Sequence, residues 1–178
     1  MHKDCEYILL SEEKIKEIVR EMAQKISEDY KDKNLILVGL LKGSVMFMSD
    51  LMKELSIDCS IDFICASSYG AGTESSGRVN IVKDVSQPLD GKDVLIVEDI
   101  IDSGNTLNFI TKYFGAKNAA SVRICTMLSK PDRRVVDIPV DYVGMEVPDE
   151  FVIGYGLDYA EKYRNLPYIG VLKPSVYS

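Results

Sequence analysis

The chain has 178 residues, 46% of them hydrophobic and 28% charged, which is typical of one globular domain with a substantial core. Its formal net charge of −7 argues against a nucleic-acid groove and against binding to an anionic membrane surface. We expect a cytoplasmic protein without histidine catalysis or zinc, because no signal peptide or long apolar run occurs, no Cys-x-x-Cys pair is present, and His2 is the single histidine.

The first part of the chain predicts a helix, a strand and a second helix. Ser11 precedes two acids and an apolar face over residues 15–26, so a helix is expected to begin there. The apolar run Leu35–Leu41 predicts a buried strand, and residues 45–55 predict a helix. The turn between them, Lys42–Ser44, suits a phosphate group but also suits a plain solvated loop.

The next part predicts two strands joined by a polar loop. Residues 57–65 alternate between apolar and polar side chains, which is typical of a half-exposed strand, and residues 79–85 predict another strand. Residues 67–78 consist mainly of glycine and serine and show no apolar period. We expect this loop to be mobile.

The central stretch predicts a strand, an acidic pair, a polar turn and a helix, in that order. Val94–Val97 predict a strand buried on both faces, and Glu98 and Asp99 stand where we expect it to end. The polar turn Asp102–Thr106 follows, and apolar residues recur at helical spacing over residues 107–114.

This turn has the features of a phosphate site. A helix start offers unpaired N–H groups and a positive dipole end, Ser103 and Thr106 add hydroxyls, and Gly104 permits close approach. The neighbouring acids would repel a phosphate alone but would bind sugar hydroxyls or a divalent cation. A phosphorylated sugar with Mg²⁺ satisfies both demands. An acidic turn that solvates a sheet end and the two-acid magnesium site of a phospho-receiver domain stay as alternatives.

The strand predicted over Ala120–Leu128 is followed by Lys130, so Lys130, Lys42 and the acidic pair all follow predicted strands. Open α/β sheets bind ligands at the carboxyl ends of their strands. The alternation of predicted strands and helices indicates an α/β fold with a largely parallel sheet covered on both faces. The aromatic, glycine-rich tail indicates a small hood. We expect a core over about 10–130 and a hood over about 131–178 that includes the N-terminal residues.

The segment Val97-Glu98-Asp99-Ile100-Ile101-Asp102-Ser103-Gly104-Asn105-Thr106 resembles the ribose-phosphate signature of type I phosphoribosyltransferases. The tail segments around Phe151, Asp158 and Arg164 resemble those of the bacterial hypoxanthine-guanine branch, and the similarity covers nearly the whole chain. The resemblance implies the type I phosphoribosyltransferase fold, Mg²⁺ dependence and a homodimer or homotetramer. It also implies purine salvage, in which the 5-phosphoribosyl group of 5-phosphoribosyl-1-pyrophosphate passes to hypoxanthine or guanine, giving IMP or GMP and pyrophosphate.

The resemblance also implies a role for each site residue. Phosphate and ribose would be bound by Glu98, Asp99, Asp102, Ser103, Gly104, Asn105 and Thr106, pyrophosphate by Lys42, Gly43 and Arg164, the purine by Lys130, Phe151, Val152 and Asp158, and Mg²⁺ by Glu98, Asp99 and Asp158. Ser68 and Tyr69 would belong to a lid over about 67–79 that closes on the substrate. Asp102 would be the general base. Lys130 would reject adenine, because an ammonium group cannot accept a hydrogen bond from a 6-amino group.

Two departures and one expected backbone feature concern phosphate binding. Asn105 stands where some family members have lysine, and Ser44 where glycine is frequent. In some family members the loop that matches Leu41-Lys42-Gly43 contains a cis peptide bond that does not involve proline, so the resemblance implies that the Leu41-Lys42 bond could be cis.

Two other functions deserve comparison. A non-catalytic regulator that retains the phosphoribosyl site would bind ligand without releasing pyrophosphate, but the acidic net charge and the presence of Asp102, Lys130 and Phe151 speak against it. A phospho-receiver or other magnesium-dependent signalling domain would be phosphorylated on an aspartate and would have no use for the aromatic tail.

Overall fold

The computed structural model describes residues 1–68 and 79–177. The strands are β1 (Cys5–Leu10), β2 (Leu35–Leu40), β3 (Ser60–Ser68), β4 (Val79–Lys83), β5 (Asp93–Ile101), β6 (Ser121–Ser129), β7 (Tyr142–Glu146), β8 (Val152–Ile153) and β9 (Ile169–Leu172). The helices are α1 (Glu12–Asp29), α2 (Val45–Glu54), α3 (Asn105–Gly115), the 3-10 turn η1 (Pro131–Arg133) and α4 (Pro174–Tyr177).

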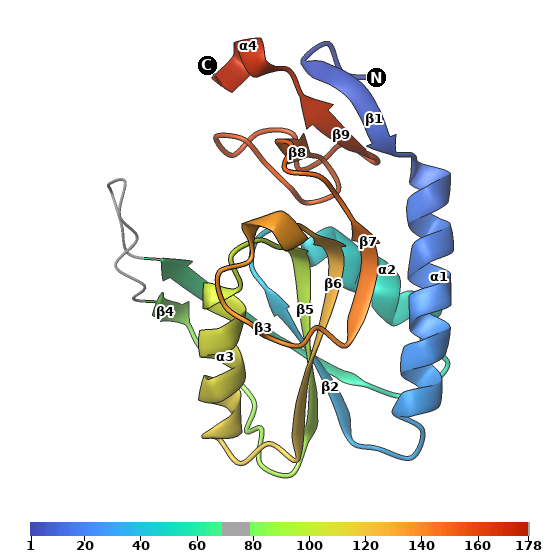
Figure 1. Ribbon diagram of the computed structural model, residues 1–178. Helices are drawn as coiled ribbons and strands as arrows, with labels where there is room; N and C mark the ends of the chain where they lie inside the picture. Colours follow the sequence, from blue (N-terminus) through green and yellow to red (C-terminus); the bar gives the residue numbers. More distant parts are fainter. Residues whose placement is uncertain (69–78, 178) are drawn as a thin grey trace.

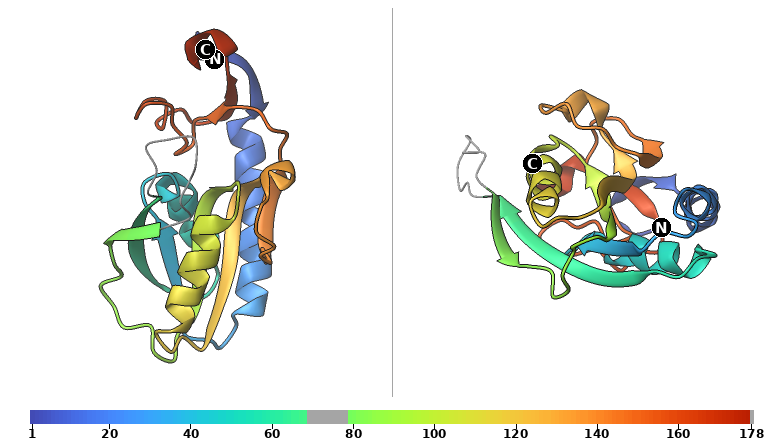
Figure 2. Two further views of the ribbon diagram at one scale, coloured as in Figure 1. Left: turned by 60° about the vertical axis from the view of Figure 1, so that its left-hand side comes forward. Right: turned by 90° about the horizontal axis from the view of Figure 1, so that it is seen from below.

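The strands form two sheets. The main sheet has the order β4-β3-β2-β5-β6-β7, and all neighbours in it are parallel except β3 and β4. A small antiparallel sheet of order β1-β9-β8 lies beyond the carboxyl ends of the parallel strands, at the top of Figure 1. Both chain termini belong to this upper part, as Figure 2 shows. The small sheet therefore covers the edge at which a parallel sheet places its ligand.

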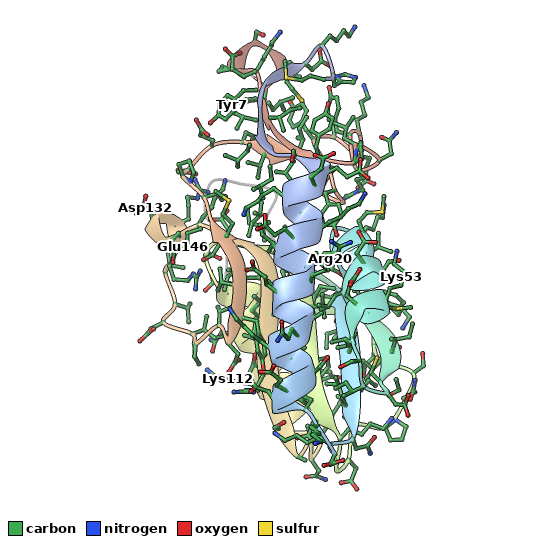
Figure 3. All side chains as sticks on the ribbon, turned by 90° about the vertical axis from the view of Figure 1, so that its right-hand side faces the viewer. Tyr7, Arg20, Lys53, Lys112, Asp132 and Glu146 are labelled. Atoms are coloured by element: carbon green, nitrogen blue, oxygen red, sulfur yellow. The ribbon has the colours of Figure 1, made fainter. Side chains whose placement is uncertain are left out.

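Helices cover both faces of the main sheet. The helix α1 begins as predicted, because the Ser11 Oγ accepts a hydrogen bond from the Lys14 N–H at 3.2 Å. Figure 3 shows α1 lying lengthwise between β7, which carries Glu146, and α2, which carries Lys53. The helix α3 lies on the opposite face (Figure 2).

Alternate residues of β2 show how the sheet separates two cores. Leu35 and Leu37 pack with the α1 and α2 side chains, whereas Ile36 and Val38 pack with the α3 side chains. All four are almost fully buried. Each such side chain stabilises the fold by roughly 1.5–3 kcal/mol, so the sheet is a firm support for its carboxyl edge.

The strand β5 is longer than predicted. Its pairing with β2 ends at Gly39↔Val97, but its pairing with β6 continues to Ile101↔Ser129. Glu98 and Asp99 therefore lie within β5 and not after it, which corrects the expected strand end. Both acids nevertheless lie past Val97, the last residue of β5 that pairs with β2.

The expected hood over residues 131–178 divides between the two sheets. Residues 142–146, which the sequence placed in the hood, form β7 and pair in parallel with β6 from Cys125↔Tyr142 to Ser129↔Glu146. The chain from β6 reaches β7 through η1 and an extended segment, so this parallel pair forms without a connecting α-helix. The rest of the tail pairs with the N-terminal strand through Cys5↔Leu172, around a small core of Cys5, Ile153 and Leu172.

Two further expectations concern the surroundings of the protein. Within residues 1–68 and 79–177, no helix combines the length and the apolar character that a membrane span requires. The four cysteines are free thiols, of which Cys5 and Cys125 are buried and Cys59 and Cys65 are partly exposed.

Candidate active site

A cavity of about 320 Å³ opens at the carboxyl edge of the main sheet. Its walls come from four parts of the chain: Leu40–Gly43, Ala66, the stretch Glu98–Gly104 with Thr106 and Leu107, and Arg164. The loop after β2, the acidic pair, the polar turn and the tail arginine thus meet around one space.

The polar turn at the start of α3 is held in place from outside. Gly104 has a φ of 86°, the left-handed region in which glycine is favoured, and it is the residue that precedes the helix. The Ser103 carbonyl accepts hydrogen bonds from the N–H groups of residues 135–136 at 3.0 and 3.2 Å. Arg134 Nε donates to the Asp102 carbonyl at 3.1 Å. The Asn105 N–H donates to Ser103 Oγ at 3.3 Å. The first turn of a helix offers further N–H groups that have no carbonyl partner within the helix, so this turn can receive an anion.

The acidic pair on β5 is half-buried. The Asp99 N–H donates to Glu98 Oε1 at 3.0 Å, and the Ile100 N–H donates to Asp99 Oδ1 at 2.7 Å. Burial, together with the charge of Asp99, raises the pKa of Glu98 well above its usual range. Burial also raises the pKa of Asp99, although its hydrogen bonds and Arg164 act in the opposite direction. A cation or hydroxyl donors would relieve this crowding of negative charge.

The loop after β2 passes very close to the acidic pair. Its Leu41–Lys42 bond is a cis peptide. A Cβ atom at Gly43 would lie 1.7 Å from Asp99 Oδ2, and a Cβ atom at Gly156 would lie 2.0 Å from the Gly43 carbonyl oxygen. Both positions therefore require glycine, because any side chain would push the loop away from the acids or from the hood.

The two cations of the site meet at one acid in the tail. Lys42 Nζ lies 2.8 Å from Glu161 Oε2, and Arg164 Nη2 lies 3.3 Å from Glu161 Oε1. Arg164 Nη2 also lies 2.9 Å from Asp158 Oδ1, and its Nη1 donates to the Gly156 carbonyl at 2.8 Å. Arg164 Nε is buried and has no hydrogen-bond partner among the described residues. Arg164 itself lines the cavity, so its guanidinium group faces the space in which a ligand would bind.

A second chain of charges joins Asp102 to Lys130. Asp102 Oδ1 accepts from Arg133 Nε at 3.0 Å, and Arg133 Nη1 lies 3.4 Å from Asp149 Oδ2. The other oxygen of Asp149 lies 3.6 Å from the ammonium group of Lys130, which is largely buried. Arg133, Asp149 and Glu161 were not among the site residues predicted from the sequence. The adjacent arginines after Lys130, and the acid between Asp158 and Arg164, were the available signals.

The aromatic part of the tail lies outside the cavity wall. Phe151 is 36% exposed, its ring stacks on Tyr177 at 5.1 Å, and Tyr159 meets it edge-on at 5.4 Å. Val152 is buried in β8. The cavity lining likewise does not include Lys130, Phe151, Val152, Asp158 or Asn105.

Two expected features are only partly represented. Within the described ranges, no three His, Cys, Asp or Glu side chains gather closely enough to hold a metal, so Asp158 does not join Glu98 and Asp99 in a three-ligand site. Ser68 ends β3, whereas Tyr69 and the rest of the expected lid over residues 69–78 lie outside the described residues.

Comparison with known proteins adds independent findings. The family described as "Phosphoribosyl transferase domain" matches residues 8–160. The chain is 56% identical, over its full length and 99% of the relative, to a hypoxanthine-guanine phosphoribosyltransferase of Staphylococcus epidermidis, and 53% identical over the same shares to one of Staphylococcus aureus. A crystal structure of a hypoxanthine phosphoribosyltransferase from Staphylococcus aureus is similar with a TM-score of 0.97 at 53% identity, covering 100% of this chain and 97% of that chain.

Proposed function

Because the chain belongs to the phosphoribosyl transferase domain family, in its hypoxanthine-guanine branch, we propose that the cavity at the sheet edge is where the family's reaction takes place. This reaction moves the 5-phosphoribosyl group of 5-phosphoribosyl-1-pyrophosphate to a 6-oxopurine in purine salvage. The fold is the α/β fold of type I phosphoribosyltransferases, as predicted. The high identity to transferases gives no support to a regulator or a phospho-receiver.

One observation carries the assignment of the site. The cavity joins a helix N-terminus, an acidic pair and two cations, which are the three environments that a phosphorylated sugar pyrophosphate needs. In this proposal, the turn of Ser103, Gly104, Asn105 and Thr106 binds the 5′-phosphate through N–H and hydroxyl donors. Glu98 and Asp99 accept hydrogen bonds from the ribose hydroxyls. Lys42, Gly43 and Arg164 bind the pyrophosphate group.

The residues present fit Mg²⁺. Two half-buried carboxylates whose pKa values are raised by burial suit a hard divalent cation, which typically uses one or two protein carboxylates and takes its other ligands from phosphates and water. Glu98 and Asp99 would hold it, with Asp158 contributing through water. When bound, Mg²⁺ would neutralise charge on the pyrophosphate oxygens.

The chemistry of this chain concerns one proton and one leaving group. A bond forms between the attacking ring nitrogen of the purine and C1 of the ribose, while the bond between C1 and the pyrophosphate oxygen breaks. Asp102 takes the proton of the purine ring as general base. Lys42 and Arg164 stabilise the negative charge that develops on the departing pyrophosphate.

The purine would lie between the ion pairs that link Asp102 to Lys130 and the aromatic part of the tail. Lys130 leaves Asp149 to donate to the 6-oxo group, Phe151 stacks on the ring, backbone groups of Val152 read the ring edge, and Asp158 contacts its far edge. Because the largely buried ammonium of Lys130 has donors only, adenine would leave two donors facing each other. Ser68 and Tyr69 would close over the substrates and exclude water.

A crystal soaked with IMP tests the site. We expect the nucleotide phosphate on Ser103–Thr106 and the base beside Lys130 and Phe151, and a phosphate bound elsewhere would overturn the assignment. Steady-state kinetics with hypoxanthine, guanine, xanthine and adenine complete the test. We expect efficient pyrophosphate release with hypoxanthine and guanine, and none above background with adenine.

Assembly and location are part of the same proposal. The free thiols suit the reducing cytoplasm, where we propose that the protein works. The helix α2 exposes Val45, Met46 and Met52, which suits a contact between copies in a homodimer or homotetramer. Sedimentation equilibrium would give the number of copies, and a Met46→Glu variant would lower it if α2 forms the interface.

A further inference from the structure

We propose that Glu161 occupies the pyrophosphate-binding cations of the empty protein and competes there with pyrophosphate and with the pyrophosphate group of the substrate. Glu161 thereby sets how tightly these ligands bind and how readily pyrophosphate leaves. This inference rests on the proposed function, because it takes Lys42 and Arg164 as the pyrophosphate ligands.

The contacts of Glu161 are those of a bridging anion. One carboxylate oxygen lies 2.8 Å from Lys42 Nζ and the other lies 3.3 Å from Arg164 Nη2. Two cations from distant parts of the chain thus share one acid, and each contacts a different oxygen of its carboxylate. Pyrophosphate would take the same two cations, so the acid and the ligand cannot hold them together.

The backbone at Glu161 supports a specific role for this side chain. Tyr159 and Lys162 exchange backbone hydrogen bonds of 3.2 and 3.0 Å, and the two residues between them, Ala160 and Glu161, have φ values of 51° and 62°. Positive φ at both central positions is the pattern of a type I′ turn, for which Asn-Gly is favoured. An Ala-Glu pair is a poor fit to this turn, which indicates that the acidic side chain serves a purpose other than forming it.

The strength of the contact suits displacement. Lys42 and Glu161 are 66% and 64% exposed, and an exposed ion pair of this kind is weak. A pyrophosphate group carries more negative charge than one carboxylate and has more oxygens that can accept hydrogen bonds from Lys42 and Arg164. Pyrophosphate therefore displaces Glu161. Because the contacts of Glu161 with Lys42 and Arg164 are lost when pyrophosphate binds, the net affinity for pyrophosphate is lowered by their strength.

The test compares variants of the full chain by calorimetric titration with magnesium pyrophosphate. Glu161→Gln keeps the size of the side chain and removes its charge, so we expect pyrophosphate to bind about three- to tenfold more tightly. The KM for the phosphoribosyl substrate should fall by a similar factor, while the KM for hypoxanthine stays unchanged. Glu161→Asn suits positive φ and should give the same direction, which guards against a folding defect of the first variant.

Glu17→Gln is the matched control. Glu17 forms an ion pair with Lys14 at 2.7 Å on α1, with similar exposure of 53% and 56%, and its loss should leave pyrophosphate affinity unchanged. The ratio of the affinities of Glu161→Gln and the unchanged protein should approach one at 1 M salt, because screening weakens the exposed pair. A merely structural role of Glu161 would not produce this salt dependence.

Unchanged or weaker pyrophosphate binding in both Glu161 variants overturns the inference. The proposed function is tested separately by Lys42→Ala and Arg164→Ala, each of which should weaken pyrophosphate binding. If these two variants bind pyrophosphate normally, the assignment of the site is wrong. If they weaken it and the Glu161 variants do not tighten it, only the role of Glu161 is wrong.

Discussion

Gly43 lies so close to Asp99 that a Cβ atom at Gly43 would be 1.7 Å from the Asp99 Oδ2. The loop after β2 therefore packs directly against the acidic pair of β5. In the proposed mechanism this contact places the pyrophosphate-binding loop next to the ribose-binding acids.

Gly43→Ala should abolish most of the activity, because the new methyl group has to displace either the loop or the Asp99 carboxylate. We expect a loss of at least about 100-fold in kcat/KM, since small displacements in a site of this kind are costly. Gly115→Ala, with nothing within 4 Å of the added Cβ, is the control and should retain full activity. Near-normal kinetics of Gly43→Ala, measured by pyrophosphate release, would show that the contact has no catalytic importance.

Asp102→Asn should lower kcat by about 10²–10⁴ with little change in nucleotide binding, because the amide cannot accept the proton but keeps the shape of the side chain. Arg133 Nε can still donate to the amide oxygen, so the turn should stay intact. Single-turnover kinetics and IMP titration measure the two effects separately. Full turnover by this variant would remove Asp102 as general base.

Lys130→Gln should change the choice of purine. An amide both donates and accepts, so it tolerates a 6-amino group that the ammonium group rejects. We expect kcat/KM for hypoxanthine to fall while the ratio of hypoxanthine to adenine efficiency narrows by at least about tenfold. The companion variant Lys25→Gln, on α1, should leave this ratio as it is. An unchanged ratio in Lys130→Gln would place the discrimination elsewhere.

Removal of divalent cations should stop turnover. The double variant Glu98→Gln/Asp99→Asn should need a higher Mg²⁺ concentration for half-maximal turnover. Because burial and Asp99 raise the pKa of Glu98, protons compete with Mg²⁺ for the pair at low pH. Apparent Mg²⁺ affinity should therefore rise with pH until the pH exceeds the pKa of Glu98 and then level off. Titrations followed by calorimetry between pH 5 and pH 9 measure this, and an affinity independent of pH contradicts it.

Asp62 should stabilise the fold above its pKa. Burial acts to raise the pKa of Asp62, but hydrogen bonds from the N–H groups of Phe63, Gln87 and Ser86 and the charge of Lys83 lower it below the usual value. A depressed pKa contributes stability that is present above the unfolded pKa of about 3.9 and is lost as the pH falls through the folded pKa. Asp62→Asn should thus cost about 1–3 kcal/mol at pH 7 and less at pH 3.

Urea denaturation at both pH values measures the effect of Asp62→Asn. The control Asp90→Asn, at an exposed position, should change the free energy of unfolding by less than about 0.5 kcal/mol. An equal loss of unfolding free energy for Asp62→Asn at pH 7 and pH 3 would show that the ionised form of the Asp62 carboxylate does not stabilise the fold.

Much of the fold follows from local pattern. The Ser11 cap, the buried strand β2 and the helical spacing after the polar turn each involve residues close in sequence, so they could be predicted. The end of β5 and the place of β7 could not. Both depend on pairing with β6, and the residues next to a strand in the sequence do not show which strands will pair with it.

The site shows the same division. The chemistry of the ligand was readable from the Asp102–Thr106 turn and the acids before it, because a helix start and carboxylates have fixed preferences wherever they occur. That Lys42 and Arg164 share Glu161, and that Arg133 and Asp149 join Asp102 to Lys130, was decided only when the loops and the tail came together. Local residue types determined what can bind here. Long-range packing decided which charges face one another in the empty site, because the strength of an ion pair depends on distance, and distance between remote segments is set by the tertiary fold.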